Sequence, residues 1–219
     1  MDLYPVRRSI LQALKDALSN FEGDFLDVGC GQMPYRPLIM KEGKVSKYVG
    51  MDFEAGSYAE RQRPNLIWDG RQIPLDENSI DSAMATEVLE HCPDPSVVLK
   101  EIYRVLKPGG AFFLTVPFLW PLHDVPYDEF RYTPFAMERL LREAGFDQVS
   151  LNALGGWDAS LAQMLGLWVR RRPMNETQRV WMSRILYPFY RYLLRKDKAP
   201  QSLEQAMMIT GLSGLAFKP

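Results

Sequence analysis

Phe25-Leu26-Asp27-Val28-Gly29-Cys30-Gly31 is the stretch of this 219-residue sequence that decides the fold. Four mostly apolar residues run into two glycines, which is the pattern of a buried parallel strand that ends in a tight turn. Because glycine has no Cβ, the backbone of such a turn can approach a ligand closely. The stretch therefore predicts a central strand with a ligand site at its carboxyl end.

Further strands and helices alternate along the chain outside this stretch. An amphipathic helix is expected over 6–20, where it either covers the domain or closes over a cofactor. Two later helices have clear ends, because Asp94 and Thr133 are good N-caps that precede a proline, and Gly109 and Gly145 follow the last turns. Strands are expected at 45–51, 66–68, 79–85, 111–116, 148–154 and 207–217.

This alternation predicts one domain over 1–219 with an α/β fold. We expect a Rossmann-like, doubly wound, mostly parallel sheet of seven strands, with helices on both faces and a helical insert at about 157–200. The two cysteines, Cys30 and Cys92, are too few for a disulfide framework and suggest reduced thiols. The beginning of the sequence has no apolar signal run, and no stretch is long enough to span a bilayer. We therefore expect a cytoplasmic protein.

Polar residues follow four of the predicted strands. The first strand ends in the glycine turn, the next two in Asp52 and Asp69, and the fourth in Thr86-Glu87. In open α/β sheets, ligands bind outside the carboxyl ends of the strands. Asp52 also lies 21 residues after Gly31, close to the spacing at which an acid binds the ribose hydroxyls of a nucleotide. The pattern favours an adenosine-type ligand.

Two other nucleotide sites are disfavoured by what the glycine turn lacks. The dinucleotide fingerprint needs a third glycine that lets the helix face a pyrophosphate, and Pro34 stands at that position. The sequence contains no Gly-Lys-Ser/Thr of a Walker phosphate loop. Both observations indicate a ligand without a pyrophosphate.

Three segments then resemble one family. Leu26 to Gly31 resembles motif I of class I S-adenosylmethionine (SAM)-dependent methyltransferases. Glu87-Val88-Leu89-Glu90-His91, followed by Pro93, is similar to the strand-four segment of the methyltransferase type 11 group, and the segment from Arg104 to Gly110 is similar to that group's next signature. They occur in the family's order, and the resemblance covers roughly residues 20–155.

The resemblance implies SAM as cofactor, S-adenosylhomocysteine as product, and no metal. Asp27, Gly29, Cys30 and Gly31 would line the methionine part, while Asp52 and Phe53 would lie at the ribose. Asp69 and Gly70 would flank the adenine, and Thr86 and Glu87 would face the reactive end. Asp69 could instead be a turn residue before Gly70, and Cys30 is expected to be a small turn residue and not a nucleophile.

The acceptor side is predicted from the loop at 117–134, which is rich in proline and aromatic residues. His123 could titrate near neutral pH, and we expect it to be a general base that Asp124 or Asp128 orients. Arg131 could bind an anionic acceptor or pair with Asp128 to hold the loop. The predicted acceptor contacts are His91, Trp120, Asp128, Arg131 and Tyr132, although His91 could equally pack or hydrogen-bond locally.

Charge is distributed unevenly around the insert at 157–200. It carries nine basic and three acidic residues, so its net charge is +6, whereas the whole chain is at −1. Large aromatic residues alternate with the arginines, which suits a helical cap with solvated arginines, a peripheral membrane surface or RNA. We expect a small-molecule acceptor and no DNA partner. The sequence does not indicate an oligomeric state.

The preferred hypothesis is methyl transfer to a small molecule, with O-methylation of a glycan, lipid-linked precursor or secondary metabolite as the favoured chemistry. RNA or protein methylation is a second hypothesis. Against nucleobase N-methylation, Thr86-Glu87 stands where those enzymes have Asn/Asp-Pro-Pro; against cytosine C5-methylation, Cys92-Pro93 is in the reverse order. A third hypothesis is a partner protein that binds SAM without catalysis.

Overall fold

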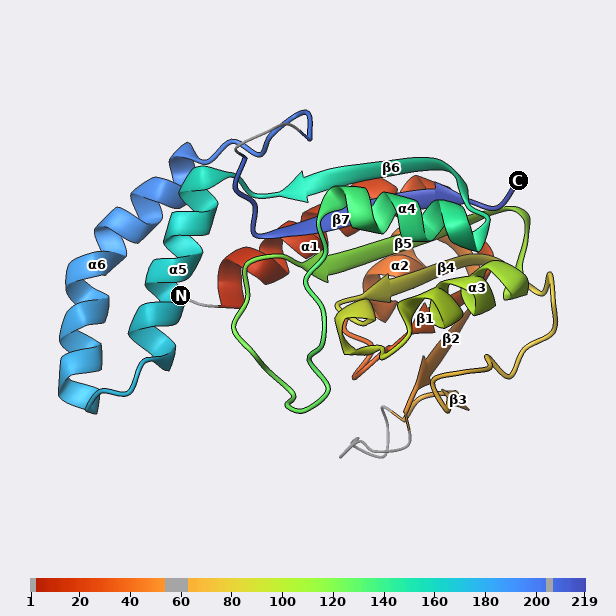
Figure 1. Cartoon of the computed structure of the whole chain (residues 1–219), viewed down its shortest axis with the longest axis horizontal. Helices are drawn as coiled ribbons and strands as arrows, with labels where there is room; N and C mark the ends of the chain where they lie inside the picture. Colours follow the sequence, from red (N-terminus) through yellow and green to blue (C-terminus); the bar gives the residue numbers. More distant parts are fainter. Residues whose placement is uncertain (1–2, 54–62, 204–206) are drawn as a thin grey trace.

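The computed structural model describes residues 3–53, 63–203 and 207–219. Within these ranges one sheet has the strand order β3-β2-β1-β4-β5-β7-β6, and β7 is the strand that runs antiparallel to its neighbours (Figure 1). The strands are β1 Glu22–Val28, β2 Lys44–Asp52, β3 Leu66–Ile67, β4 Ile80–Thr86, β5 Leu106–Pro117, β6 Asp147–Leu154 and β7 Gly211–Phe217. The predicted seven-stranded, mostly parallel, doubly wound sheet is confirmed.

Helices lie on both faces of this sheet, as expected. They are α1 Leu3–Ala17, α2 Arg36–Glu42, α3 Pro95–Val105, α4 Pro134–Ala144, α5 Trp157–Arg171 and α6 Glu176–Lys196, with 3₁₀ turns η1 Leu18–Asn20 and η3 Leu89–His91. The predicted last strand is four residues too long, because β7 begins only at Gly211.

Each face of the sheet has its own apolar core. On one face, Leu14 of α1 and Ile39 of α2 pack with the buried rings of Phe21 and Phe25. On the other, the stripes of α3 and α4, which include Ile102 and Leu141, pack on the sheet. Helices with one apolar stripe bury it against a sheet, which fixes which side faces inward.

The structure confirms the predicted ends at Asp94, Thr133 and Gly145. It contradicts the one at Gly109, because α3 already ends at Val105 and Gly109 lies in β5. The Asp94 carboxylate accepts hydrogen bonds from the backbone N–H groups of Ser96 and Val97 at 3.1 and 3.3 Å. The Thr133 hydroxyl accepts one from Ala136, and Gly145 ends α4 in the left-handed conformation at φ 108°. Such caps satisfy backbone groups that the helix leaves without partners.

The basic insert is a hairpin of α5 and α6 that enters from β6 and returns to β7. It extends beyond the edge at which the parallel strands end, at the left of Figure 1. Its own small core consists of Ala162, Tyr190 and Leu193. At its base, the Asp197 carboxylate accepts hydrogen bonds from the backbone N–H groups of Gly156 and Ala159.

In the described ranges, we find no helix whose length and apolar character would let it cross a membrane.

Candidate functional site

The strand ends that carry the predicted cofactor residues meet at one edge of the sheet. In the parallel ladders, Val28 at the end of β1 lies opposite Met51 of β2 and Ala85 of β4. The residues that follow these strands therefore surround the same point, as a ligand site in this fold requires.

The glycine turn after β1 is fastened to the end of β2. The N–H of Cys30 donates to the carbonyl of Met51 at 3.0 Å, and the N–H of Gly31 donates to Asp52 Oδ2 at 2.7 Å. Gly29 and Gly31 have φ of 65° and 50°, a conformation that glycine adopts without strain. Cys30 is buried, and burial raises the pKa of its thiol to about 12. Its expected role as a small turn residue matches this environment.

Asp52 lies where an acid could hold two hydroxyls. Its Oδ1 accepts the N–H of Phe53 at 2.8 Å, while Oδ2 accepts the N–H of Gly31. A carboxylate has about four acceptor positions, so each oxygen retains one for a ligand. The structure thus orients the carboxylate with main-chain donors, and its contact with ribose stays a prediction.

Asp27 lies beneath the turn and is 1% exposed. The Tyr48 hydroxyl donates to its Oδ2, and its Oδ1 has no hydrogen-bond partner. Burial raises the pKa of Asp27 to about 7, and the negative charge of Asp52 adds to that rise. The expected direct contact with methionine does not agree with this position, because the side chain supports the turn from inside the sheet.

The predicted adenine side contains a turn and an aromatic pair. The Asp69 carboxylate accepts the N–H groups of Arg71 and Gln72 at 2.8 and 3.0 Å, which holds its pKa below the usual range. This is the turn that the alternative interpretation of Asp69 expected. Phe53, 40% exposed, stacks on Trp68 with ring centroids 5.4 Å apart. The pair offers an apolar surface beside Gly70.

Glu87 follows Thr86 at the end of β4 with φ 56°, a left-handed conformation that non-glycine residues seldom adopt. Its Oε1 accepts the Thr115 hydroxyl at 2.9 Å, and burial raises its pKa to about 7. It lines a narrow cavity together with Val6 and Ser9 of α1. Strained residues that are held by their surroundings cluster at functional sites. The first helix thus reaches this end of the site as well as covering the sheet.

The acceptor loop at 117–134 is held by one ion pair. Arg131 donates to both oxygens of Asp128 at 2.7 and 2.8 Å, and the Asp128 side chain is 1% exposed. The remaining Arg131 donors contact the carbonyls of Trp120, Pro121 and Phe130. Of the two roles considered for Arg131, the structure shows the pairing with Asp128 that holds the loop, and contact of either residue with an acceptor stays a prediction.

His123 contacts Asp128, five residues later, in this loop. Its ring Nδ1 and its backbone N–H each lie 3.1 Å from Asp128 Oδ2. Asp124 is exposed, with φ 48°, and its carbonyl accepts the N–H of Tyr127 in a turn. Of the two acids proposed to orient His123, the structure selects Asp128 and contradicts Asp124.

A second histidine lies against the first. The ring centroids of His91 and His123 are 4.7 Å apart at 68°, and Trp120 lies 6.5 Å from His123. His91 Nδ1 is 3.2 Å from the carbonyl of Tyr127. The predicted residues His91, Trp120 and His123 are thus together, and both imidazoles are partly exposed.

Tyr132 does not face this space. It is 4% exposed, and its hydroxyl donates to the carbonyl of Leu89 at 2.8 Å. The N–H groups of Glu129 and Phe130 donate to the carbonyl of Glu90. Tyr132 therefore attaches the loop to η3, and its predicted acceptor contact is wrong.

Sequence reasoning missed two side chains of this region. Glu90 is fully buried, and burial, followed by the charge of Glu87, raises its pKa to about 9. Gln163 of α5 donates to the carbonyl of Leu119 and so ties the hairpin to the loop. Glu90 belongs to a segment identified by its resemblance, but its burial follows from the packing of η3, which no local pattern indicates.

Comparison with known proteins agrees with this geometry. Residues 26–114 match the family model described as "Methyltransferase domain". Over this segment the chain is similar to methyltransferase domains.

The names of two relatives of this chain differ, since the first states only the donor and the second states a biosynthetic pathway. A probable SAM-dependent methyltransferase of Mycolicibacterium smegmatis is 28% identical over 57% of this chain and 52% of its own length. The ubiquinone biosynthesis O-methyltransferase of Coxiella burnetii is 32% identical over 41% of this chain and 42% of its own. The chain thus spans about half the length of these relatives.

A solved structure extends the similarity of the fold beyond the matched segment. A SAM-dependent methyltransferase from Thermotoga maritima has a TM-score of 0.63 at 17% identity, covering 99% of this chain and 93% of its own. The family match ends at residue 114. The acceptor loop and the α5–α6 hairpin therefore lie outside the segment that the family model matches.

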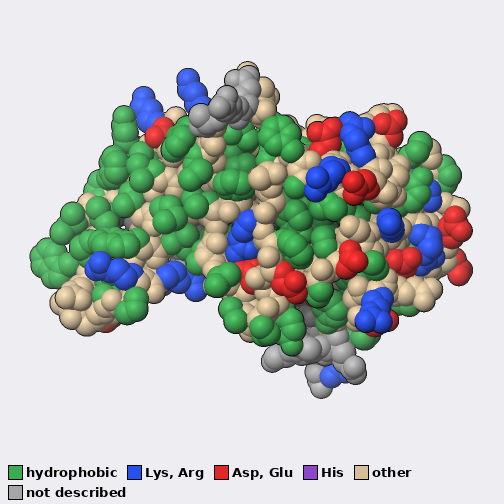
Figure 2. Space-filling view, in the orientation of Figure 1, with side chains coloured by type: hydrophobic (Ala, Val, Ile, Leu, Met, Phe, Trp, Pro, Cys, Tyr) green, Lys and Arg blue, Asp and Glu red, His purple; other side chains and the backbone are tan. Residues whose placement is uncertain are grey.

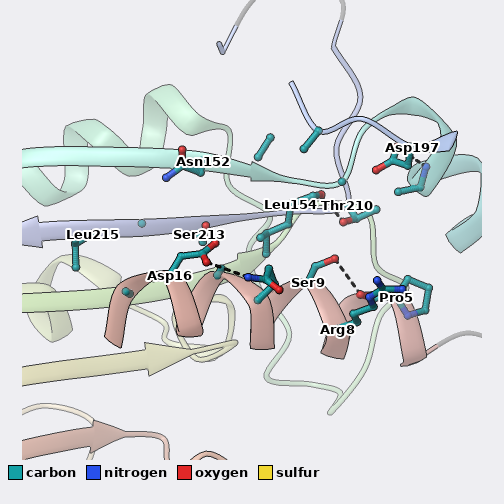
Figure 3. Close-up of a pocket in the computed structure, with 18 of the residues that line it drawn as sticks. Pro5, Arg8, Ser9, Asp16, Asn152, Leu154, Asp197, Thr210, Ser213 and Leu215 are labelled. Carbon is teal, nitrogen blue, oxygen red and sulfur yellow. Dashed lines mark hydrogen bonds between the residues drawn. The ribbon is translucent and has the colours of Figure 1, made fainter. Parts of the chain in front are cut away.

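A larger cavity, of about 520 Å³, lies beside this site and not within it. Figure 3 shows it between α1, with Arg8, Ser9 and Asp16, and the strands β6 and β7, with Asn152 and Ser213. None of the predicted cofactor residues lines it. The residues predicted to bind the donor lie instead at the strand ends, around the glycine turn and Asp52.

Proposed function

We propose that this protein transfers the methyl group of SAM to a hydroxyl of a small-molecule acceptor. The observation that carries the proposal is the main-chain cradle formed by Gly31 and Asp52, which lies on the same sheet edge as the His91–His123 pair. One region suits an adenosine-type donor, and the other suits proton removal from an acceptor.

In the proposed reaction, an acceptor oxygen attacks the methyl carbon in line with the S–CH₃ bond. The sulfur keeps the bonding electron pair, which yields S-adenosylhomocysteine. The acceptor proton passes to His123 Nε2, because Nδ1 is held by Asp128. The protein contributes alignment and the exclusion of water, and Glu87 and Trp120 line one narrow cavity.

Calorimetric titration with SAM and S-adenosylhomocysteine tests the donor site. We expect micromolar binding by the wild type and a loss of at least about tenfold in Asp52→Ala, because a charge-assisted pair of hydrogen bonds is removed. Asp147→Ala, an exposed acid at the start of β6, is the matched control and should bind normally. Folded wild-type protein that binds neither ligand would refute the proposal and favour a non-catalytic scaffold.

The proton acceptor is tested by the release of S-adenosylhomocysteine with a panel of phenols, sugars and lipid-linked sugars. His123→Ala should keep SAM affinity and lose at least about 100-fold in kcat, the usual contribution of a general base. Full activity of this variant with a hydroxyl acceptor would reject that assignment. Activity only with RNA or protein would favour the second hypothesis.

We also propose that the α5–α6 hairpin holds the protein at an anionic membrane surface, where an amphiphilic acceptor would reside. Exposed large side chains gather on it, and Figure 2 shows them as an apolar area on the projecting part at the left, with basic groups beside it. They include Trp157, Leu161, Met164, Trp168, Trp181, Ile185, Tyr187, Phe189 and Tyr192.

The charge of the hairpin complements such a surface. Arg172 lies over the Trp168 ring at 4.2 Å, and Arg191 lies over Tyr187 at 5.8 Å, so cationic and aromatic groups face outward together. Aromatic groups that enter the interface beside arginines that attract anionic headgroups are typical of peripheral membrane helices. The +6 charge of the insert supports the choice of an anionic surface.

Co-sedimentation with vesicles of phosphatidylglycerol and phosphatidylcholine tests this contact. We expect wild-type protein to bind anionic vesicles, less so at high salt, and the double variant Trp181→Ala/Ile185→Ala to bind several-fold less. Phe135→Ala, an exposed aromatic on α4, is the matched control. Equal binding by both variants would refute the membrane contact, and salt-sensitive retention on RNA alone would assign the hairpin to nucleic acid.

A further inference from the structure

The proposed reaction gives no role to Glu90, a buried acid next to the candidate site. Its side chain is completely buried, and neither carboxylate oxygen has a hydrogen-bond partner. A buried polar group without a partner is costly, and native structures compensate buried carboxylates with cations, donors or metal ions. Among the described residues no side chain supplies such a partner, so a bound cation is a candidate.

Two imidazoles are next to this carboxylate. His91 Nε2 lies 3.9 Å from Glu90 Oε1, and one potential ligand atom from each of Glu90, His91 and His123 lies within 4.8 Å of the others. Ligand atoms that bind one tetrahedral ion at about 2.0–2.2 Å lie about 3.3–3.6 Å from one another. The widest separation would have to shrink by about 1.2–1.5 Å, a movement that rotation of a partly exposed imidazole can supply.

Both histidines are also oriented as metal ligands are. His123 Nδ1 donates to the Asp128 carboxylate, and His91 Nδ1 donates to the carbonyl of Tyr127. A histidine that binds a metal usually donates its other ring N–H to a carboxylate or a backbone carbonyl, which fixes its tautomer. Here that leaves both Nε2 lone pairs available.

We propose that Glu90, His91 and His123 bind one divalent transition-metal ion. Two imidazoles and one carboxylate suit Zn²⁺ and its neighbours better than Mg²⁺ or Ca²⁺, which prefer oxygen ligands. Three protein ligands leave a coordination position open, and the partial exposure of both histidines gives it access to solvent or acceptor. This replaces the expectation of a protein without metal.

The ion would change how the acceptor loses its proton. Because metal binding uses the His123 Nε2 lone pair, the loaded protein would activate an acceptor hydroxyl by coordination, since Zn²⁺ lowers the pKa of a bound water to about 7. The metal site itself does not depend on methyl transfer. Its test measures metal binding, so its failure and the failure of the proposed function are distinguishable.

The test is calorimetric titration of chelator-treated, full-length protein with ZnCl₂, together with metal analysis after dialysis. We expect one Zn²⁺ per chain with micromolar or tighter affinity, and a loss of at least about 100-fold in His91→Ala and His123→Ala. Asp124→Ala, next to His123 but outside the proposed set, is the matched control. Unchanged affinity in the histidine variants would overturn the proposal.

Glu90→Gln tests the site in a variant that should still fold, because glutamine keeps the size of the side chain and is neutral. Its circular dichroism should match the wild type while its Zn²⁺ affinity falls. Visible absorption of the Co²⁺-loaded protein should show ligand-field bands without thiolate charge transfer, because Cys30 and Cys92 are buried. Wild-type protein that binds no Zn²⁺, or a folded Glu90→Gln that binds it normally, would overturn the site.

Discussion

The predicted donor half and acceptor half of the candidate site are held by different kinds of contact. At the donor half, backbone groups supply the contacts, since the N–H groups of Gly31 and Phe53 orient the Asp52 carboxylate. At the acceptor half, side chains supply them, since the ion pair of Asp128 and Arg131 holds an irregular loop. Main-chain contacts suit a donor of constant shape, whereas a loop held by a few charged side chains can be altered without disturbing the strands.

Removing the ion pair of the loop should have the largest effect. In Arg131→Ala the buried Asp128 carboxylate loses its charged partner and keeps only its contacts with His123. The hydrogen bonds from Arg131 hold the pKa of that carboxyl far below its usual range. Breaking a buried pair costs about 3–5 kcal/mol. We expect that loss in urea unfolding, faster proteolysis within 117–134, and SAM affinity within about twofold of wild type.

Arg139→Ala removes an exposed helix pair with Glu143 and is the control, with no measurable change expected. A large loss of SAM affinity in Arg131→Ala would show that the two halves are not independent.

The buried acid beneath the donor half should make stability depend on pH. The pKa of Asp27 is about 7 in the folded protein against 3.8 ordinarily, so the folded state keeps a proton that the unfolded state has lost. Stability should therefore fall as pH rises from about 4 to 7, by up to about 4 kcal/mol from this group. In Asp27→Asn this part of the slope should vanish.

Urea unfolding of both proteins at pH 5 and pH 8 measures that difference. Parallel curves for wild type and Asp27→Asn would mean that Asp27 is ionised in the folded protein.

Substitutions of two glycines in the donor turn should distinguish an effect on folding stability from an effect on SAM binding. A Cβ at Gly29 would lie 2.4 Å from Val88 Cγ2, whereas one at Gly31 would meet no protein atom within 4 Å. Gly29→Ala should cost about 1–3 kcal/mol of stability. Gly31→Ala should cost about 1 kcal/mol but weaken SAM binding at least about tenfold, because its methyl group would point into ligand space.

Gly109→Ala, with φ 80° and open surroundings, is the control for the conformational cost alone. Thermal unfolding and calorimetry report the two quantities separately. Normal SAM binding by Gly31→Ala would move the donor away from this turn.

The smallest effect is expected at the acid beside His123 in sequence. Asp124 is exposed and does not contact the His123 ring, so Asp124→Asn should leave kcat within about twofold. A large loss would restore Asp124 as the residue that orients His123.

Most helix ends and turns of the fold could be predicted from the conformational and hydrogen-bonding preferences of single residues. The Asp94 cap, the Thr133 cap and the glycine turn each follow from preferences of the residue itself, which act over a few positions. The choice between Asp124 and Asp128 does not, because an irregular loop has no period that tells which side chain turns inward. The same holds for Tyr48, whose contact with Asp27 depends on the register of two strands.

The place of the hairpin between β6 and β7 has a consequence for folding during synthesis. In the described sheet β6 pairs with β7 alone, and β7 fills the position between β5 and β6. The ribosome makes β6 and both hairpin helices before residues 211–217 exist. Until then β6 has no strand to pair with, and the edge of β5 stays open to other chains. We expect a nascent chain stalled before residue 211 to need a chaperone until its last strand arrives.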